Sequence, residues 1–580
     1  MPTIFDALNI GVSGIFVNKA AINTTGNNVA NVNTPGYSRE RVDILPSMPM
    51  LSYAGVFGTG AEISQIISTR DELIDKRVRT ANQEMSYYNK LNSSLDEIQS
   101  VFNEENGVGL KGAMEQFFNA WHALSLNPDL ETARQQVIEK GLTLSKAIKD
   151  ANASLHQIGT NLDNQVSSTI TEINSLSKRI AQLNYEIKKA ELGDKDHANT
   201  LRDERSVLLE KLSSIADVTI LEGAYDENSK PEMTILLGGM PIVSGKDYNE
   251  LTAEKLNGSE YYRVYFVEPS GSKVDITSRI KNGSLGATLN LRDTIIPEYK
   301  EKLDNIAKTL IQEVNKVHSS GAGLTPYSQV EGIYQANPNA TLSLTSATGL
   351  DIAVKTGSFK VKIIDENGND VGTFTVPVNS DDHLIAEDAS DEHSLINRFN
   401  NILQGYAQMS VSGAGNVQIT ALNGYKFAFT YDSSNFLAAV GINTFFTGHD
   451  SGDIDINRTL RNDPSKIAAG KTLNPGDSSN AEAIAQIQLN KVMVNNTQTI
   501  DEYYNAFLGT IGSTKQRFDE VYKAKQAVYQ QLKTTQQSLE GVSLDEEAAN
   551  LIKFQRAYQA NAKFISVVDE MTQTLINMVR

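Results

Sequence analysis

The stretch TTGNNVANVNTPGYSRE, residues 24–40, follows a segment with regular apolar spacing and ends that regularity abruptly. Five asparagines occur within eleven residues here: Asn23, Asn27, Asn28, Asn31 and Asn33. Asparagine suits the end of a helix because it tolerates the left-handed conformation, and its amide both donates and accepts hydrogen bonds. The dipeptide Pro35-Gly36 then forces a turn, and Tyr37 begins a segment of loop and short strands. The stretch therefore predicts the end of the first helix.

The residues before this stretch predict a long helix from about Thr3 to about Val29. Thr3 and Asp6 have the spacing of a capping box. Apolar residues recur every seven positions, at Leu8, Ile15, Ile22 and Val29, and small residues flank them at Ala7, Gly14 and Ala21. A narrow apolar row beside small residues favours the close approach of another helix.

The C-terminal segment shows the same kind of pattern. Ser543 and Glu546 have the capping-box spacing that starts a helix. One heptad row contains Leu544, Leu551, Tyr558 and Ile565, and the other contains Phe554, Asn561, Val568 and Leu575. A polar residue such as Asn561 in an apolar row often fixes helix register at some cost in stability, although exposure also explains it. Periodicity alone fits equally a helix pair within one chain and helix contacts between chains.

The composition of the chain excludes several classes of protein. Its 580 residues allow several domains, and the absence of cysteine excludes disulfides, thiol chemistry and common structural zinc sites. A formal charge of -18 disfavours a nucleic-acid partner. No apolar run reaches the length of a membrane span, and the N-terminus lacks the pattern of a cleavable signal. The termini also lack a dense basic face, which disfavours membrane binding.

Between the termini, long helical patterns alternate with β-rich patterns. We expect helices over 71–102, 114–126 and 295–317, a very long proline-free helix within 129–192, and another over 500–540. The segment 219–290 predicts strands, and 341–446 is rich in Thr, Ser, Gly and Asn. Within it, alternation around Asn367-Gly368 predicts a hairpin.

These patterns predict an α+β multidomain fold with a long α-helical stem built from both chain termini and inserted β-rich outer domains. Four domains are expected: a terminal helical inner domain of 1–60 and 541–580, a helical bundle of 61–215 and 461–540, a mixed and mainly β domain of 216–330 with one helix, and a β-rich variable outer domain of 331–460.

No pattern of residues predicts catalysis, a cofactor or a metal site. The seven histidines are scattered, and each is expected on the surface or in packing: His122, His156, His197, His318, His383, His393 and His449. The segment 365–376 starts like a calcium loop, but it lacks the required Gly at its sixth position and Glu at its twelfth, so we interpret it as a hairpin turn. Glu546-Glu547 is interpreted as dipole complementarity at a helix N-terminus.

Two terminal motifs carry a family resemblance. The sequence NNVANVNTPGYSRE at 27–40 resembles the N-terminal signature of flagellar rod, hook and hook-associated proteins, and SLDEEAANLIKFQRAYQANAKFISVVDEM at 543–571 resembles the matching C-terminal end. Tyr37-Ser38-Arg39, the run 545–550 and the chain length point to the hook-associated branch of that family. The segments 117–141 and 283–293 support this branch, whereas 330–450 matches nothing recognisable.

The resemblance implies a structural protein without catalysis, exported uncleaved by the flagellar type III apparatus to the hook-filament junction. It implies partners: copies of the chain in a ring-like helical zone of about one turn, hook protein on the proximal side, a second junction hook-associated protein on the distal side, and a cytoplasmic chaperone that binds the C-terminal helix. In such axial proteins the terminal segments form the innermost helical layer and tend to be disordered before assembly.

Under this resemblance, the terminal stripes become intermolecular, and each buried Leu or Ile contributes about 1.5 to 3 kcal/mol. The expected N-terminal interface is Leu8, Ile15, Ile22, Asn27, Asn28, Val29, Asn31, Asn33, Pro35, Gly36 and Tyr37. The expected C-terminal interface is Leu544, Leu551, Phe554, Tyr558, Asn561, Ile565, Val568 and Leu575. Replacing Asn28 and Asn31 with Leu is expected to leave the isolated chain folded and to disturb assembly.

Two alternatives remain open from the sequence. One is a hook or distal rod protein of the same axial family, which the long helices within 129–192 and 500–540 disfavour. The other is a secreted adhesin or enzyme module in 341–446 carried on flagellar-type termini.

Overall fold

The computed structural model describes residues 3–53, 55–103, 109–191, 198–222, 232–386 and 391–579. The chain divides into two compact units, and neither is continuous in sequence. The first unit contains Met1–Ser94, Thr160–Asp293 and Lys515–Arg580, and the second contains Leu95–Gly159 and Thr294–Thr514. The expected four-domain division stays a prediction.

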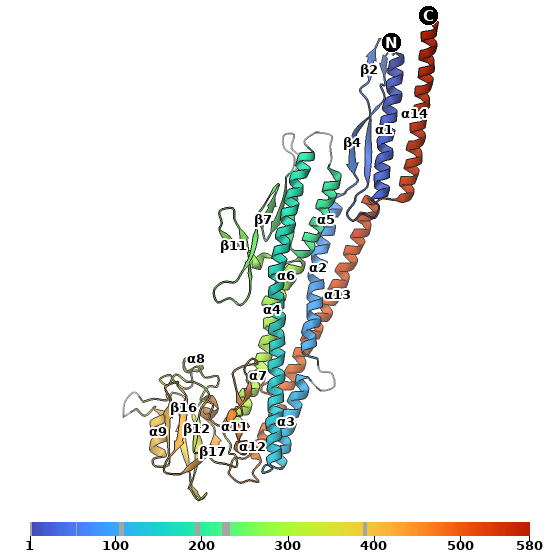
Figure 1. Ribbon diagram of the computed structural model, residues 1–580. Coiled ribbons are helices and arrows are strands. Elements are labelled where there is room, and N and C mark those ends of the chain that lie inside the picture. The colour runs from blue at the N-terminus through green and yellow to red at the C-terminus, as the bar shows by residue number, and fades with distance from the viewer. Residues whose placement is uncertain are drawn as a thin grey trace. The chain divides into compact units, whose positions relative to one another are not determined.

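The long helices lie close to where the sequence predicts them (Figure 1). They are α1 (Ile4–Ala30), α2 (Glu72–Val101), α3 (Leu110–Leu126), α4 (Glu131–Ala190), α5 (Asn199–Ile215), α7 (Ile296–Ser319), α13 (Ile500–Glu540) and α14 (Leu544–Val579). The predicted capping box starts α1, because the Asp6 amide donates to Thr3 Oγ1 and the Thr3 amide donates to an Asp6 carboxylate oxygen. None of these helices, over the described residues, has the length and apolarity of a membrane span. The α+β class with long terminal helices and a β-containing middle is confirmed.

The first unit contains small antiparallel sheets beside its helices. Their strands are β5 (Val218–Glu222), β6 (Met233–Leu237), β7 (Met240–Ser244), β8 (Asp247–Tyr248), β9 (Leu251–Glu254), β10 (Arg263–Val267) and β11 (Lys273–Asp275). Strands β5 to β8 form one sheet in sequence order, and β9 to β11 form another. Buried side chains of α4, such as Ile170 and Ile173, share a core with Leu212 of α5 and Ile235 of β6. This core anchors the sheets to the helices.

The expectation of strands through residue 290 is wrong for its last part. After β11 the chain forms the short 3-10 helix η2 (Thr277–Arg279) and then α6 (Gly283–Asn290). Alternation fails here because Leu285, Ala287 and Leu289 are all buried together with the residues between them. A helix buried on all sides lacks a polar face, so periodicity does not distinguish it from a strand.

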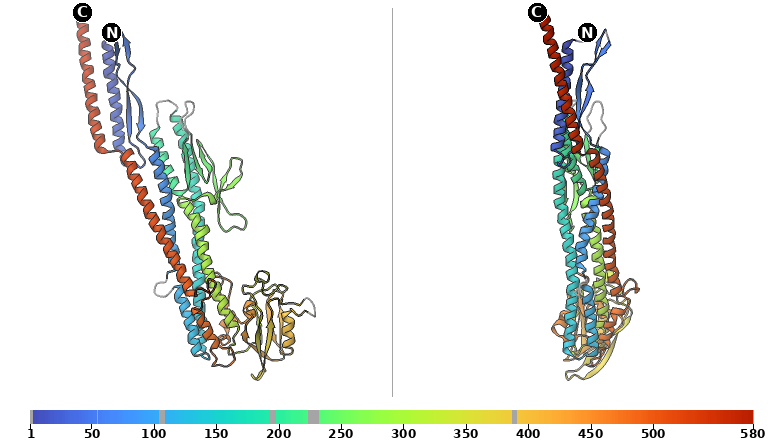
Figure 2. Two further views of the ribbon diagram at one scale, coloured as in Figure 1. Left: turned by 180° about the vertical axis from the view of Figure 1, so that it is seen from behind. Right: turned by 90° about the vertical axis from the view of Figure 1, so that its right-hand side faces the viewer.

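A ribbon of strands follows α1 in the first unit. Strand β1 (Glu40–Pro46) pairs with β4 (Ala61–Ser68), and β2 (Met50–Ser52) pairs with β3 (Gly55–Phe57), all antiparallel. Figure 1 and both views of Figure 2 draw α1 between this ribbon and α14. The contacts agree, because α1 packs against α14, β1 and β4.

The second unit joins helices to a β-rich region. Strands β13 (Gly357–Ile364), β14 (Asp370–Val378) and β17 (Lys426–Asp432) form one sheet, and β12 (Gln329–Glu331), β15 (Ala407–Val411) and β16 (Val417–Ala421) form another. Its remaining elements are α8 (Thr345–Thr348), α9 (Leu395–Ile402), α10 (Phe436–Ala439), β18 (Phe446–Thr447), β19 (Asp455–Ile456), α11 (Arg458–Asn462) and α12 (Ser479–Gln486). Buried aromatic residues, including Trp121 of α3 and Phe445, connect helices to this region.

The predicted hairpin around Asn367-Gly368 is confirmed. It joins β13 to β14, and one Asp365 carboxylate oxygen accepts hydrogen bonds from the amides of Asn367 and Asn369. The Asn369 side-chain amide also donates to Asp365, and this bond, together with the backbone bonds, lowers the pKa of Asp365. The role of Asp365 is therefore turn chemistry.

Candidate assembly interface

The two chain termini form one antiparallel helix pair, α1 with α14. The seam passes through small residues of α1: a Cβ at Gly11 would lie 2.7 Å from Ile565 Cγ1, and one at Gly14 would lie 2.6 Å from the Asn561 side chain. Only glycine allows the two backbones to approach this closely without displacement of these side chains. The prediction of close helix approach is therefore confirmed, and the partner is the other end of the same chain.

This pairing corrects the expectation that the terminal stripes are wholly intermolecular. Val568 is buried, and Leu551, Phe554, Asn561 and Ile565 are partly buried. The open alternative, an antiparallel pair within one chain, accounts for these residues. The Asn561 amide donates to the Ala557 carbonyl at 2.9 Å, so its polar group is satisfied within its own helix while it faces Gly14.

The signature segment after α1 connects four elements of the first unit at one joint. The Ser38 hydroxyl donates to an Asp203 carboxylate oxygen of α5 at 2.7 Å, and the Ser38 amide donates to the other at 3.1 Å. The Arg39 amide donates to the carbonyl of Glu540, the last residue of α13, at 2.8 Å. The Arg39 guanidinium pairs with Glu546 at 2.8 Å and Glu547 at 2.7 Å, in the first turn of α14. Ser38 and Arg39 thus attach the pair of α1 and α14 to α5 and α13.

Asn28 is the central amide of this joint and is 1 % exposed. Its Nδ2 donates to the Glu40 carbonyl at 2.8 Å and to a Glu547 carboxylate oxygen at 3.2 Å. Its Oδ1 accepts from the Glu40 amide at 2.9 Å and from the Tyr37 hydroxyl at 2.8 Å. An amide suits this place because it supplies donors and acceptors together. All of these partners lie in the same chain, so Asn28 stabilises the isolated chain itself; that replacing Asn28 and Asn31 with Leu leaves the isolated chain folded and disturbs assembly stays a prediction.

The neighbouring asparagines mostly complete the helix end. Asn31 caps α1, and its Nδ2 donates to the Asn27 carbonyl at 3.0 Å. Asn27 donates to the Tyr37 hydroxyl and to Glu40 Oε2, both at 3.3 Å. Asn33 is exposed in the following turn. Gly36 has a φ of +77°, and a Cβ there would lie 2.2 Å from Val207 Cγ2, so glycine is required for conformation and for space.

Acidic groups gather at the joint, and burial changes their protonation. Burial, with the charges of Asp75 and Asp71, raises the pKa of Glu540 to about 7, although the Asp71 amide donates to its carboxylate at 2.7 Å. Burial also raises the pKa of Asp203 against the opposing effect of its bonds to Ser38 and of the Arg70 charge. The arginines at this joint thus offset charge that burial disfavours.

The remaining expected interface residues lie on the surface. The structure leaves Val29, Leu544, Tyr558 and Leu575 exposed, and Leu8, Ile15, Ile22 and Tyr37 partly buried; Pro35 is exposed. The helix pair also exposes apolar residues that the heptad rows did not include: Phe5, Phe16, Ile552, Phe564, Val567, Met571, Ile576 and Met578. The pair therefore has a closed seam and an open apolar exterior.

Sequence reasoning missed the charged half of the joint. Asp203, Arg70 and Glu540 lie far along the chain from Ser38 and carry no local motif. Glu546-Glu547 was assigned to dipole complementarity alone, whereas both residues also pair with Arg39. The sequence feature that indicates this joint is the polar run 37–40. It follows a helix end and provides more hydrogen-bonding groups than a turn requires.

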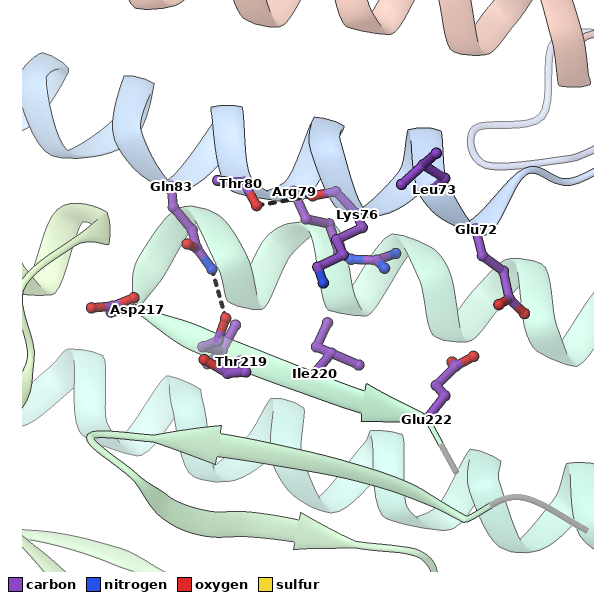
Figure 3. A pocket seen from close by; sticks show the side chains of 11 residues that line it. Glu72, Leu73, Lys76, Arg79, Thr80, Gln83, Asp217, Thr219, Ile220 and Glu222 are labelled. Carbon is purple, nitrogen blue, oxygen red and sulfur yellow. Dashed lines mark hydrogen bonds between the residues drawn. The ribbon is translucent and has the colours of Figure 1, made fainter. Parts of the chain in front are cut away.

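A hollow of about 400 Å³ lies between α2 and β5 in the first unit (Figure 3). Gln83 Nε2 donates to the Val218 carbonyl at 2.9 Å on one side, and Lys76 and Arg79 extend into it from α2. Burial lowers the pKa of Arg79 against the charge of Asp75. The lining side chains lack a nucleophile paired with a base.

Among the described residues, Asp381, Asp382 and His393 form the group whose side-chain atoms approach as metal ligands would. The buried Asp382 already pairs with Arg398, and His393 is largely exposed, so the central carboxylate of this group is already bound by an arginine. His318 is buried, as expected for packing, while His197 lies outside the described residues.

Three segments of the chain match known protein families. Residues 95–332 match the family described as Flagellar hook-associated protein FlgK helical domain. Residues 8–37 match the family of flagella basal body rod proteins, and 535–578 match the family Flagellar basal body rod FlgEFG protein C-terminal. These last two segments contain most of α1 and α14.

Relatives match over essentially the whole chain. Flagellar hook-associated protein 1 of Bacillus subtilis is 25 % identical, covering 100 % of this chain and 99 % of the relative. The protein of the same name from Escherichia coli is 24 % identical, covering 98 % and 99 %. The solved flagellar hook junction protein FlgK from Burkholderia pseudomallei has a TM-score of 0.50 at 18 % identity, covering 80 % of this chain and all of that one, and supports the fold.

The names of these relatives describe a flagellar component rather than an enzyme, in agreement with the expectation from sequence. Both rod-type termini and the helical domain occur in one chain, which aligns with these relatives over essentially their whole length. The chain is therefore similar over essentially its whole length to flagellar hook-associated protein 1, contains a segment that matches the FlgK helical domain, and is a structural component of the bacterial flagellum.

Proposed function

We propose that this chain forms the junction zone that connects the flagellar hook to the filament and acts there as a mechanical adaptor. The observation that carries this proposal is the helix pair itself. Two segments that match rod-type families pair antiparallel, and the 37–40 segment attaches them to α5 and α13. The Burkholderia relative, described as a hook junction protein, supports the same role.

The geometry suits a subunit that transmits force. Arg39 and Asn28 bind the two buried acceptors of Glu547, and a buried ion pair with satisfied hydrogen bonds resists separation of its partners. In an axial lattice the helix pair continues the tube shared by hook and filament, and its exposed apolar side chains face neighbouring copies. The β-rich region of the second unit sets the spacing of subunits.

The proposal includes specific partners. Copies of the chain form a ring-like helical zone of about one turn through heterologous contacts. Hook protein binds on the proximal side and a second junction hook-associated protein binds on the distal side. The chain leaves the cell through the flagellar type III apparatus, and a cytoplasmic chaperone covers α14 before export. Chaperone binding that survives removal of residues 541–580 would contradict that last assignment.

Deletion of the chain from a flagellated cell tests the junction role. We expect intact hooks without filaments and unpolymerised filament protein in the medium, counted by electron microscopy and by protein assay. A hook or rod protein would remove the hooks themselves, and an adhesin or enzyme module would leave filaments attached. Either result would overturn the proposal.

A further inference from the structure

The ribbon that follows α1 ends in an apolar hairpin with no charge. From Ile44 to Ala61 the chain has 18 residues without Asp, Glu, Lys or Arg, where the average charged content of 21 % would give about four. Met48 is 87 % exposed and Tyr53 is fully exposed. An exposed apolar segment of this length typically marks a protein contact site.

The hairpin has one covered face and one open face. Met50 pairs with Phe57 across β2 and β3, and both are partly buried. Leu51 pairs with Val56 on the opposite face, and they are 85 % and 66 % exposed. A two-stranded hairpin is marginally stable by itself, so its open face gains stability from a partner.

The contacts of the ribbon show which part of the helix pair lies beside the open face of the hairpin. The Ala61 amide donates to Ser13 Oγ at 3.3 Å, which places the point where the β1–β4 pairing ends and the hairpin begins beside the N-terminal half of α1. Figure 1 shows the ribbon running from there toward the start of α1. Figure 1 draws β2 beside the N-terminal end of α1, so the tip of the hairpin lies level with the start of α1.

The part of α14 that lies beside the start of α1 is also apolar and uncharged. Because Gly14 faces Asn561 and Gly11 faces Ile565, the start of α1 lies near Met571 to Leu575. The segment Met571–Val579 has no charged residue, whereas Asp569 and Glu570 directly precede it and earlier turns carry Lys553, Arg556 and Lys563. Met571, Leu575 and Ile576 are exposed. Contact between two uncharged surfaces avoids the cost of desolvating charge.

We propose that the open face of the hairpin, Leu51 with Val56, packs against the uncharged segment Met571–Met578 of α14 in a second copy of this chain. Since α1 lies between the hairpin and α14 of the same chain, each copy presents one surface on either side (Figure 2). Such a head-to-tail contact repeats around an axis, whereas hairpin-to-hairpin contact would close a dimer. This inference rests on the proposed ring of copies and specifies its lateral contact.

Cysteine cross-linking in assembled flagella tests the contact, because the chain has no cysteine of its own. The full-length chain carries Leu51→Cys together with one of Met571→Cys, Leu575→Cys or Ile576→Cys. After oxidation, we expect a ladder of cross-linked multimers from at least one double variant and only monomer from each single variant. Dimers from Leu51→Cys alone, cross-links only to another flagellar protein, or no ladder in flagella with attached filaments would each overturn the proposal.

A charge substitution provides a second, independent measurement. Leu51→Asp with Val56→Asp places two carboxylates on the open face, and Leu344→Asp is the control at an exposed apolar residue outside the ribbon. We expect both variants to be exported and folded by circular dichroism, with loss of attached filaments only for the hairpin variant. Normal attachment would overturn the lateral contact and leave the junction role intact, whereas normal filaments on deletion of the chain would overturn the junction role itself.

Discussion

At the scale of single residues, Asn28 shows how one amide organises a joint. Its side chain binds Glu40, Tyr37 and Glu547, all within the chain. Asn28→Asp keeps the shape, removes both donor bonds and places a carboxylate beside Glu547. We expect this change to destabilise the terminal helix pair by about 2 to 4 kcal/mol, the range for disrupting a buried polar network.

Hydrogen exchange over residues 4–30 and 544–579 of the purified chain measures this effect. Asn33→Asp is the matched control, because it makes the same chemical change at an exposed turn residue. The control should exchange like the unmodified chain. Equal protection in Asn28→Asp and the control would show that the joint does not depend on the Asn28 donors.

The residue scale is also where prediction from sequence is weakest. The asparagine-rich stretch correctly predicted a helix end, and Asn31 performs that function. It did not reveal that Asn28 binds Glu547, because 519 residues separate the two positions. The partner of a polar group depends on tertiary pairing that a single sequence does not specify.

At the scale of elements, the seam between α1 and α14 depends on glycine. Gly11→Ala with Gly14→Ala would place each new methyl group under 3 Å from Ile565 or Asn561. We expect separation of the helices and a loss of about 1 to 3 kcal/mol, the usual cost of overpacking. The thermal unfolding of the helix pair, followed by hydrogen exchange at increasing temperature, measures this loss.

Gly26→Ala is the control in the same helix, since a Cβ at Gly26 meets no atom within 4 Å. Alanine there should raise helix stability by about 0.5 to 1 kcal/mol, because glycine is a poor helix former. If the double variant were also stabilised, the close approach of α1 and α14 would not limit the pair.

Elements were predictable where a periodic pattern was long. Helices such as α4, with 60 residues, and α13, with 41, follow from apolar spacing over many turns. The heptad rows also predicted residues of the α14 seam, but they did not show whether the partner helix belongs to the same chain or to another copy. Short, fully buried α6 has no such pattern, and its sequence alone predicts a strand.

At the scale of the whole molecule, the second compact unit contains a buried histidine that makes its stability sensitive to acid. The second unit buries His318 completely, with Nδ1 bonded to the Asn443 carbonyl at 2.7 Å and Nε2 accepting from the Ala468 amide at 3.0 Å. Burial lowers the pKa of His318 to about 4, against the ordinary value of 6.5. A neutral ring is required, since protonation of Nε2 would break the bond from Ala468.

The sign of the pH dependence follows from these two pKa values. Between pH 6.5 and 4 the unfolded chain binds a proton at His318 that the folded unit does not, so stability falls as the pH falls through this window. Above pH 6.5 the histidine contributes no slope. We expect a slope of up to about 1.4 kcal/mol per pH unit from this one group.

Trp121, the single tryptophan, reports on this region because its buried ring lies 6.1 Å from the His318 ring. Denaturant unfolding followed by its fluorescence at several pH values should show the unfolding free energy decreasing between pH 6.5 and 4. His318→Phe keeps an aromatic ring beside Trp121 and cannot titrate, so its stability should be lower at neutral pH but should lose less on acidification. The variant and the unmodified protein share every other titrating group. If their unfolding free energies changed equally with pH, His318 would already bind its proton in the folded unit.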